Sequence, residues 1–183
     1  MKRCGVRLPK RLVPPIAADG IRLRPLQESD LPLTRGWRNE PDIRKWFFHS
    51  DLISEEQHLA WWQAYCERDD DYMFVIEETR HLHRPVGQVG VYNVDWLAGT
   101  GEFGRLLVGD AQARGQGLAK KAVQALVAAM TGMGVSVLRL EVMESNQSAR
   151  EVYRATGFTE SGITEGVVMM ERRGPDVPAP ASR

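Results

Sequence analysis

The stretch DAQARGQGLAKKAV, residues 110–123, constrains the fold of this chain more than any other segment. Gly115 and Gly117 stand two residues apart, and a sequence with the apolar periodicity of an amphipathic helix follows them. A helix N-terminus presents backbone N–H groups without intrahelical partners, and glycines let these amides turn outward toward an anion. The segment therefore predicts a phosphate or pyrophosphate site at the start of a helix. The alternative is that the glycines only shape a tight turn between a strand and this helix.

Two common nucleotide-binding patterns do not account for this segment. The P-loop pattern GxxxxGK[ST] is absent, because the residue immediately before Lys120 is alanine and not glycine. The dinucleotide pattern GxGxxG is also absent, since only the glycines at 115 and 117 are present. Arg114 adds a full positive charge to the segment, which agrees with an anionic ligand.

The composition is that of a globular domain without a strong electrostatic field. The chain has 183 residues, 43% of them hydrophobic and 26% charged, with a formal net charge of zero. No global charge attracts it to nucleic acid or to an anionic membrane, and no run approaches the ~20 apolar residues of a membrane span. The two cysteines, Cys4 and Cys66, form no CxxC, so neither a metal site nor a disulfide framework is expected. We expect a cytoplasmic protein, because the basic start of the chain lacks the apolar region of a signal peptide.

The chain reads as one domain with two arms. Residues 1–19 are basic and proline-rich, and residues 173–183 are rich in small residues and proline, so both are expected to be flexible. Between them, residues 20–172 show the order strand, two helices, three strands, helix, strand, helix, strand. Within this order, Ser54 is expected to cap the second helix and Pro41 to end the first. The pattern predicts an α+β fold in which an antiparallel meander leads into a βαβ crossover.

Two motifs in this order resemble a known family. Residues 112–117, QARGQG, have the form Q/R-x-x-G-x-G/A, and residues 146–158, NQSAREVYRATGF, contain the matching Asn, Ala, Tyr and Gly-Phe. Together they resemble the GCN5-related N-acetyltransferases, abbreviated GNAT. The resemblance implies a mixed, mostly antiparallel sheet of six to seven strands flanked by four helices, with two central strands splayed around a bulge. It also implies acetyl-CoA as the cofactor, with its pyrophosphate held by the amides of residues 112–117. The residues implied in cofactor binding are Leu106, Leu107, Val108, Gln112, Arg114, Gly115, Gln116, Gly117, Leu118, Ala119, Asn146, Ala149 and Tyr153.

Acetyl transfer to an amine requires a base, an oxyanion donor and an acid for the departing thiolate. The resemblance implies Tyr153 as the acid, although packing on the buried helix face is an alternative role. It implies Glu102 as the base, although a surface carboxylate at a strand start is an alternative, and Glu141 and Glu144 are weaker candidates. A backbone N–H of Leu107 or Val108 is implied as the oxyanion donor. Asn146 is expected to cap its helix and, by resemblance, to bind the pantetheine arm.

The two early helices and their connecting loop are expected to face the acceptor. This segment is rich in Trp, Arg and His, which suit flat rings and phosphate, although core packing explains several of its aromatic residues. It resembles the branch that N-acetylates nucleotide-linked 4-amino-deoxysugars in pseudaminic acid synthesis, and also ribosomal-protein N-terminal acetyltransferases. Surface around Trp61 is either a wall of this site or an interface between two copies. A CoA-binding module without transferase activity is a third alternative. The residues expected to bind the acceptor amine are Trp37, Arg38, His58 and Tyr92.

Overall fold

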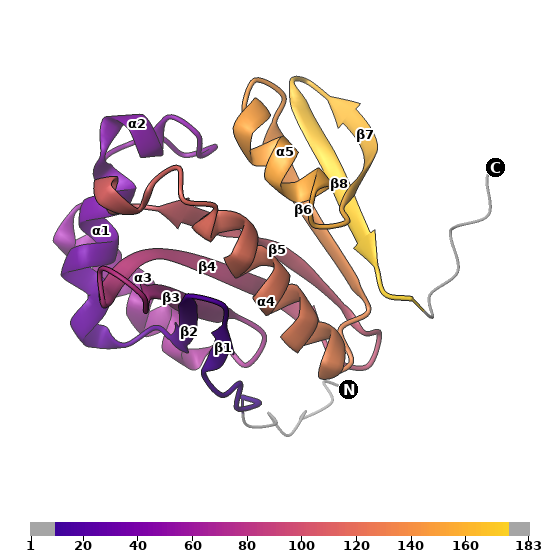
Figure 1. Cartoon of the computed structure of the whole chain (residues 1–183), viewed down its shortest axis with the longest axis horizontal. Helices are drawn as coiled ribbons and strands as arrows, with labels where there is room; N and C mark the ends of the chain where they lie inside the picture. Colours follow the sequence, from indigo (N-terminus) through magenta and orange to yellow (C-terminus); the bar gives the residue numbers. More distant parts are fainter. Residues whose placement is uncertain (1–9, 176–183) are drawn as a thin grey trace, which may run out of the picture.

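The computed structural model describes residues 10–175, which form one eight-stranded sheet with helices on both faces (Figure 1). The strand order is β1-β2-β3-β4-β5-β6-β8-β7. The strands are β1 Ile16–Ala18, β2 Ile21–Pro25, β3 Tyr72–Glu78, β4 Arg84–Asp95, β5 Thr100–Val108, β6 Val137–Met143, β7 Thr159–Thr164 and β8 Val167–Arg173. The helices are α1 Leu31–Asn39, α2 Pro41–Arg44, α3 Glu55–Glu67, α4 Leu118–Gly132 and α5 Gln147–Arg154, with short 3-10 turns at Glu28–Asp30 and Ala111–Ala113.

All the elements expected from the sequence are present, and three more accompany them. The sheet has eight strands instead of six to seven, and five α-helices instead of four. β1 lies inside the segment expected to be a flexible arm, where Ala17 pairs with Arg22 of β2. β7 is a polar, mostly exposed edge strand, so it lacks the alternation that reveals a strand in the sequence. α2 begins at Pro41, because proline suits the first turn of a helix as well as it ends one.

Both ends of the domain extend beyond the expected limits of residues 20 and 172. Val13 is buried in the main core, although it lies within the expected arm. At the other end, Arg173 belongs to β8, and the Gly174 N–H donates to the Ser136 carbonyl at 2.6 Å. The remaining parts of the two arms, residues 1–9 and 176–183, lie outside the described residues.

The expected splay between two central strands is confirmed. β5 and β6 are parallel neighbours, but their pairing runs only from Thr100↔Val137 to Glu102↔Arg139, although both strands continue. A bulge on β5 accompanies the divergence. Gln88 of β4 pairs with Leu107, but Gly90 pairs with Gly104, so β5 carries one extra residue. Arg105 lies within this bulge at φ +55°, in the left-handed region. Figure 1 shows β6, β8 and β7 turning away from the rest of the sheet.

α4 packs on the sheet through one apolar face. Its buried residues recur at helical spacing, which gives an apolar stripe toward the core. They are Leu118, Ala122, Val123, Leu126, Val127 and Met130.

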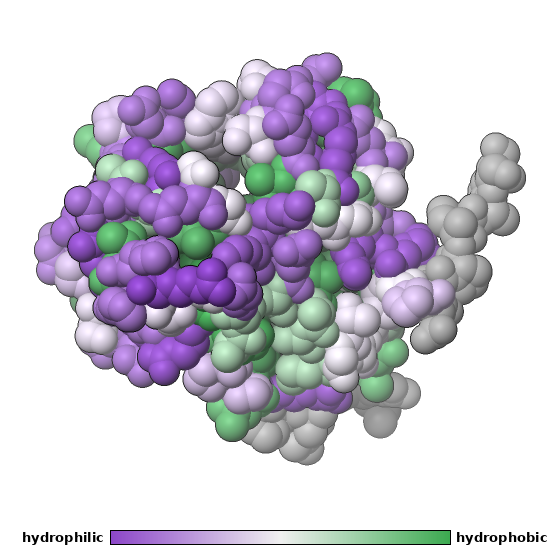
Figure 2. Space-filling model, in the orientation of Figure 1, coloured by the Kyte–Doolittle hydropathy of each residue, from purple (hydrophilic) through white to green (hydrophobic). Residues whose placement is uncertain are grey.

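The face seen in Figure 2 is largely hydrophilic, with a hollow between the region of α2 and the region of α5. The chain reaches the start of α4 directly from β5, the strand that diverges from β6.

Candidate active site

The turn before α4 has the backbone geometry of an anion site. Gly115 and Gly117 adopt φ +75° and +73°, and nothing lies within 4 Å of a Cβ built on either glycine. Among the described residues, no hydrogen-bond partner is present for the amides of residues 114–117. The amides of Leu118 and Ala119 belong to the first turn of α4 and lack intrahelical acceptors. The residues present therefore fit a pyrophosphate, and the positive φ values explain the glycines.

Two expected features of this turn differ in the structure. The amides of Gln112 and Ala113 already donate to Asp110, at 2.9 and 3.1 Å, so the free amides begin at Arg114. The guanidinium of Arg114 also turns away from the glycines. It forms an ion pair with Glu40 at 2.7 Å and donates to the carbonyl oxygens of Val108 and Gly109. The positive charge of Arg114 is thus balanced by Glu40 instead of standing free beside the turn.

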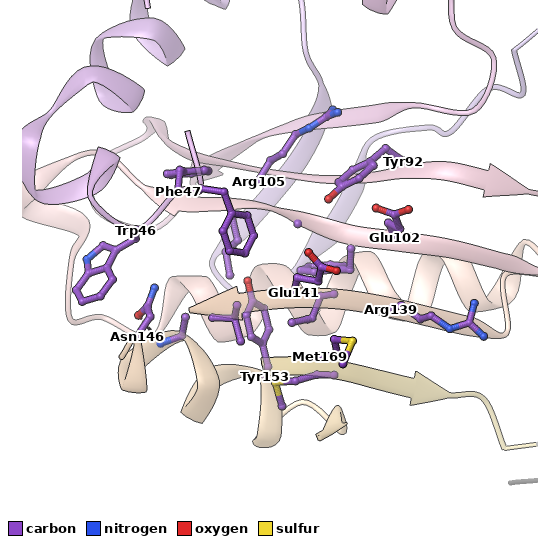
Figure 3. Close-up of a pocket in the computed structure, with 18 of the residues that line it drawn as sticks. Trp46, Phe47, Tyr92, Glu102, Arg105, Arg139, Glu141, Asn146, Tyr153 and Met169 are labelled. Carbon is purple, nitrogen blue, oxygen red and sulfur yellow. Dashed lines mark hydrogen bonds between the residues drawn. The ribbon is translucent and has the colours of Figure 1, made fainter. Parts of the chain in front are cut away.

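A cavity of about 580 Å³ opens where β5 and β6 separate (Figure 3). Its floor is formed by the two splayed strands, and α5 and the segment after α2 lie at its ends. Its lining includes Trp46, Phe47, Phe48, Tyr92, Glu102, Phe103, Arg105, Leu106, Arg139, Glu141, Asn146, Ala149 and Tyr153.

The ring of Tyr153 packs in the core, and its role as the acid stays a prediction. Its ring packs edge-on against Phe103 and Phe158, at centroid distances of 6.1 and 5.8 Å, so it belongs to the core. Its hydroxyl points into the cavity (Figure 3). Burial raises the pKa of Tyr153 well above its usual value, and the charge of Tyr92 adds to this effect. The phenol is therefore fully protonated near neutral pH, the state that a proton donor requires.

Asn146 caps α5, as expected. Its side-chain oxygen accepts a hydrogen bond from the Ala149 N–H at 3.2 Å, which satisfies one free amide at the helix start. Gly157 follows the helix at φ +91°, in the left-handed conformation that ends many helices. Asn146 and Ala149 both line the cavity. The second expected role, binding a pantetheine arm, stays a prediction.

Two carboxylates line the cavity. Glu102 lies on β5 directly opposite Tyr92 of β4, and Glu141 lies on β6. Burial raises the pKa of Tyr92, and the nearby charge of Glu102 raises it further. Glu144 follows the end of β6 and is not one of the residues that line this cavity. The structure thus places Glu102 and Glu141 together and leaves Glu144 aside.

The backbone of β5 distinguishes between the candidate oxyanion donors. The Gly109 N–H donates to Val86 of β4 at 2.8 Å, and the carbonyl of Leu107 also faces β4, against Gly87. Backbone groups alternate sides along a strand, so those of Leu106 and Val108 face away from β4, toward β6. The side chain of Leu107 is buried beside Ile43. The geometry favours Val108 over Leu107 as the donor.

A second cavity of about 380 Å³ shares Phe47 and Arg105 with the first. Arg38 and His58, far apart in the sequence, both line it. The guanidinium of Arg38 stacks on Phe47 at 3.7 Å and donates to the His49 carbonyl at 2.5 Å. Its Nη1 is buried and has no hydrogen-bond partner among the described residues. Arg38 therefore retains an unused hydrogen-bond donor in the wall of this cavity.

His58 presents a neutral ring to the same cavity. It stacks on Trp61 with a centroid distance of 5.3 Å and an interplanar angle of 6°. Burial lowers the pKa of His58, and the positive charge of Arg35 lowers it further. Trp61 lines the same cavity, which favours its role as an acceptor wall.

Arg105, which was not among the site residues expected from the sequence, lines both cavities. Its guanidinium forms a two-bond ion pair with the buried carboxylate of Asp71, at 2.7 and 3.0 Å, and lies 4.4 Å from the ring of Tyr92. The signal in the sequence was a single arginine within an apolar strand, GEFGRLLV. Gln88, buried on β4 and also part of the second cavity, left no comparable signal.

Trp37, which was expected to bind the acceptor, lines neither cavity. Its side chain is only 6% exposed and packs with Ile43 and Leu107. A Cβ at Gly109 would overlap its ring, so the tryptophan fills space that this glycine leaves. Tyr92, by contrast, lines the first cavity. The periodicity of α1 explains this position, since Leu31, Thr34 and Trp37 share one buried face.

No helix within residues 10–175 combines the length and apolar character that crossing a bilayer requires. The same residues contain no group of three or more His, Cys, Asp or Glu side chains placed to hold a metal ion. Cys66 is exposed and unpaired, and Cys4 lies outside the described residues.

Two curated relatives match parts of the chain. An uncharacterized protein of Methanocaldococcus jannaschii is 24% identical over 142 residues, which are 77% of this chain and 28% of that protein. An uncharacterized N-acetyltransferase of Bacillus subtilis is 46% identical over 50 residues, which are 27% of this chain and 32% of that protein. The matches thus span less than a third of the length of either relative.

Solved structures share the fold over most of the chain. The spermidine N-acetyltransferase of Vibrio cholerae, in complex with CoA and spermine, has a TM-score of 0.73 at 21% identity, covering 84% of this chain and 95% of that one. A ribosomal L7/L12 α-N-protein acetyltransferase in complex with coenzyme A has a TM-score of 0.73 at 18% identity, covering 87% and 98%. At these identities the likeness establishes the fold.

A family model assigns the chain directly. The model described as an acetyltransferase (GNAT) domain matches residues 21–159, which include the turn before α4 and the whole of α5. This match supports the N-acetyltransferase class and the acetyl-CoA cofactor that the sequence predicts. The chain belongs to the GNAT acetyltransferase family.

Proposed function

We propose that this protein is an acetyl-CoA-dependent N-acetyltransferase whose acceptor is a small primary amine with an anionic end, best matched by a nucleotide-linked 4-amino-deoxysugar. Two observations carry the proposal, one for each substrate. The free amides at the start of α4 follow β5 in the chain, and β5 lines the cavity into which Tyr153 points. The unpartnered Nη1 of Arg38 lies beside the adjoining cavity.

The coenzyme supplies an activated acetyl thioester when bound. The amides of residues 114–119 would hold its pyrophosphate through the backbone and the positive end of α4. The backbone edges of Leu106 and Val108 and the side chain of Asn146 would hold the pantetheine arm along the splay. Ala149 is small and lines the same cavity, so it leaves room for that arm.

Each proton has a residue to receive or supply it. Glu102 would accept the proton that the neutral acceptor amine loses as its nitrogen bonds to the acetyl carbon, and would then release it to solvent. The Val108 N–H would donate a hydrogen bond to the acetyl oxygen as negative charge develops there. Tyr153 would donate its proton to the departing thiolate sulfur and regain one from solvent.

The charge of the second cavity selects among acceptor classes. Its lining includes two arginines, Arg38 and Arg105, and contains no Asp or Glu among the described residues. Arg105 is paired with Asp71, whereas Arg38 has no carboxylate partner in the described part of the chain. A polyamine would meet like charge there, whereas a nucleotide phosphate would pair with Arg38 and its base would stack on Trp61 or Phe47. Sharing the fold of a spermidine acetyltransferase is therefore no reason to expect spermidine as the acceptor of this chain.

A protein N-terminus is the second candidate acceptor. Trp46 and Phe48, at the mouth of the first cavity, are 40% and 52% exposed, and such apolar surface would suit a peptide side chain. A cytoplasmic location and a homodimer stay predictions from the sequence.

A thiol-release assay with three acceptors tests the proposal. A nucleotide-linked 4-amino-deoxysugar, spermidine and an N-terminal peptide are each supplied with acetyl-CoA, and products are identified by mass spectrometry. We expect acceptor-dependent thiol and an N-acetylated sugar nucleotide. Faster acetylation of the peptide or of spermidine would contradict the acceptor class. Binding of acetyl-CoA without amine-dependent thiol would identify a non-catalytic module.

A further inference from the structure

β4 carries a second irregularity, next to Glu102. Tyr92 pairs with Glu102 and Asp95 pairs with Thr100, so two residues of β4 oppose the single residue Gly101. Asn93 is one of these two and adopts φ +50°, a conformation that asparagine tolerates better than most residues. In a regular strand, Asn93 and Tyr92 would point to opposite faces. The bulge instead brings the Asn93 amide to the carboxylate, where Nδ2 donates to Oε1 of Glu102 at 2.8 Å.

Arg68 fixes the orientation of this amide. Its Nη2 donates to Oδ1 of Asn93 at 2.6 Å, and its guanidinium is held by Asp70 through bonds of 2.8 and 3.0 Å. A guanidinium can only donate, so it must meet the amide oxygen of Asn93. The amide nitrogen is thereby left for Glu102, and a flipped amide would place two donors against each other.

We propose that Asn93 is a positioning residue for the reaction: held by Arg68, it fixes the carboxylate of Glu102 in the orientation that takes the acceptor's proton. This inference rests on the proposed role of Glu102 as the base. The bond occupies Oε1 and leaves Oε2 free to accept a proton. It also restrains a side chain that would otherwise rotate freely, because Glu102 is exposed.

Several other charged and titratable groups approach Glu102 from the neighbouring elements. Tyr92 faces it from β4, and the register partner Arg139 and the carboxylate of Glu141 face it from β6. Arg105 lies on β5 itself and lines the same cavity. Arg68 and Asp70 approach from the α3–β3 connection through Asn93.

Two variants at position 93 test the inference while keeping the backbone. Glycine and aspartate both tolerate a positive φ, so Asn93→Gly and Asn93→Asp are expected to fold. Asn93→Gly removes the bond, and we expect kcat to fall about tenfold or more, with the KM for acetyl-CoA unchanged. Asn93→Asp still accepts from Arg68 but presents a negative charge to Glu102. A second carboxylate favours the protonated form of Glu102, so the acid limb of the kcat profile should move about one pH unit upward.

Two further variants separate positioning from a general structural effect. Glu165→Gly relaxes another left-handed position, φ +51° in the β7–β8 turn, and should leave kcat unchanged. In a Glu102→Gln background, Asn93→Gly should cause no additional loss, because the residue it positions is already disabled. The ¹³C shift of the Glu102 carboxyl group, followed against pH, should titrate at higher pH in Asn93→Asp than in the wild type.

The outcomes distinguish this inference from the proposed function. If Glu102→Gln lowers kcat but both Asn93 variants match the wild type in kcat and pH profile, the positioning role is wrong and the function stands. Additive losses in the double variant would also overturn it. If Glu102→Gln is as active as the wild type, the proposed base is wrong and the inference fails with it. A lower kcat, a shifted acid limb and a non-additive double variant would support it.

Discussion

The turn before α4 and the second cavity, which lies beside α3, differ in the chemical groups that form them. The turn is contiguous, and its ligand-facing groups are the backbone amides of residues 114–119. The cavity is assembled from separate elements, with Arg38 from α1, His58 from α3 and Arg105 from β5. The first site needs glycine conformations, whereas the second needs particular side chains held by neighbours.

This difference determines how each site responds to substitution. An amide site depends on φ and ψ, so most side-chain changes nearby leave it intact and a change at a left-handed glycine does not. A side-chain site depends on its partners, as Arg38 depends on Phe47 and His49. We expect coenzyme binding to be robust, and acceptor choice to change with few substitutions.

Tyr153 lines the first cavity, which adjoins the cavity beside α3, and its substitution should show the largest effect. Tyr153→Phe keeps the ring that packs against Phe103 and Phe158 but removes the proton donor. We expect kcat to fall by about 100-fold or more, because positioned proton transfer contributes roughly that much. The affinity for acetyl-CoA, measured by calorimetry, should be unchanged. Unchanged turnover would remove Tyr153 from the mechanism.

Arg38→Ala should separate the acceptor from the coenzyme. A hydrogen bond to a charged group contributes about 1.5–3 kcal/mol, so we expect the acceptor KM to rise by about 10- to 100-fold. The KM for acetyl-CoA should change little. Arg44→Ala is the matched control, because Arg44 lies nearby on α2 and its side chain makes only a 3.4 Å hydrogen bond, to the Ser50 carbonyl, within residues 10–175. An equal rise in both KM values would contradict the assignment of the second cavity.

Gly117→Ala should have the converse effect. Alanine at φ +73° is strained by about 1–2 kcal/mol, so we expect the Kd for coenzyme A to rise about tenfold. The acceptor KM should stay near its wild-type value. Gly132→Ala on the same helix has open space and no positive φ, and should leave the Kd unchanged. A wild-type Kd for Gly117→Ala would show that the turn does not hold the coenzyme.

Substitution of Glu78 should change the stability of the folded state without affecting either site. Three backbone N–H groups, led by that of Leu82, lower the pKa of Glu78 to about 2 from 4.5. The folded state is stabilised by the ionised form, so this contribution is complete above pH 4.5 and is lost as the pH falls toward 2. Glu78→Gln should therefore lower the unfolding temperature near pH 7, and the difference should vanish near pH 2. A difference independent of pH would contradict this account.

Local patterns explain what the sequence could predict. The turn before α4, the Asn146 cap and the Ser54 capping box depend on residues within a few positions of one another, and all lie where expected. β1 and β7 were missed because a three-residue strand and a polar edge strand carry no periodic signal.

Long-range packing explains where the site differs from the sequence-based expectations. Trp37 was expected to contact the acceptor, but its environment depends on Gly109 and Leu107, more than 60 residues away in the chain. Arg105 was missed because its direction depends on a bulge and on the buried Asp71. The ion pair between Arg114 and Glu40 likewise joins two elements that no local pattern connects.

An amide-resolved NMR titration with coenzyme A tests the central claim most directly. ¹H–¹⁵N spectra are recorded as the coenzyme is added, and shifts are followed for every assigned backbone N–H. The account predicts that the largest saturable shifts occur at residues 114–119, and that they disappear with pantetheine, which lacks the pyrophosphate. Saturable binding that leaves these six amides unmoved, or no binding, would contradict it.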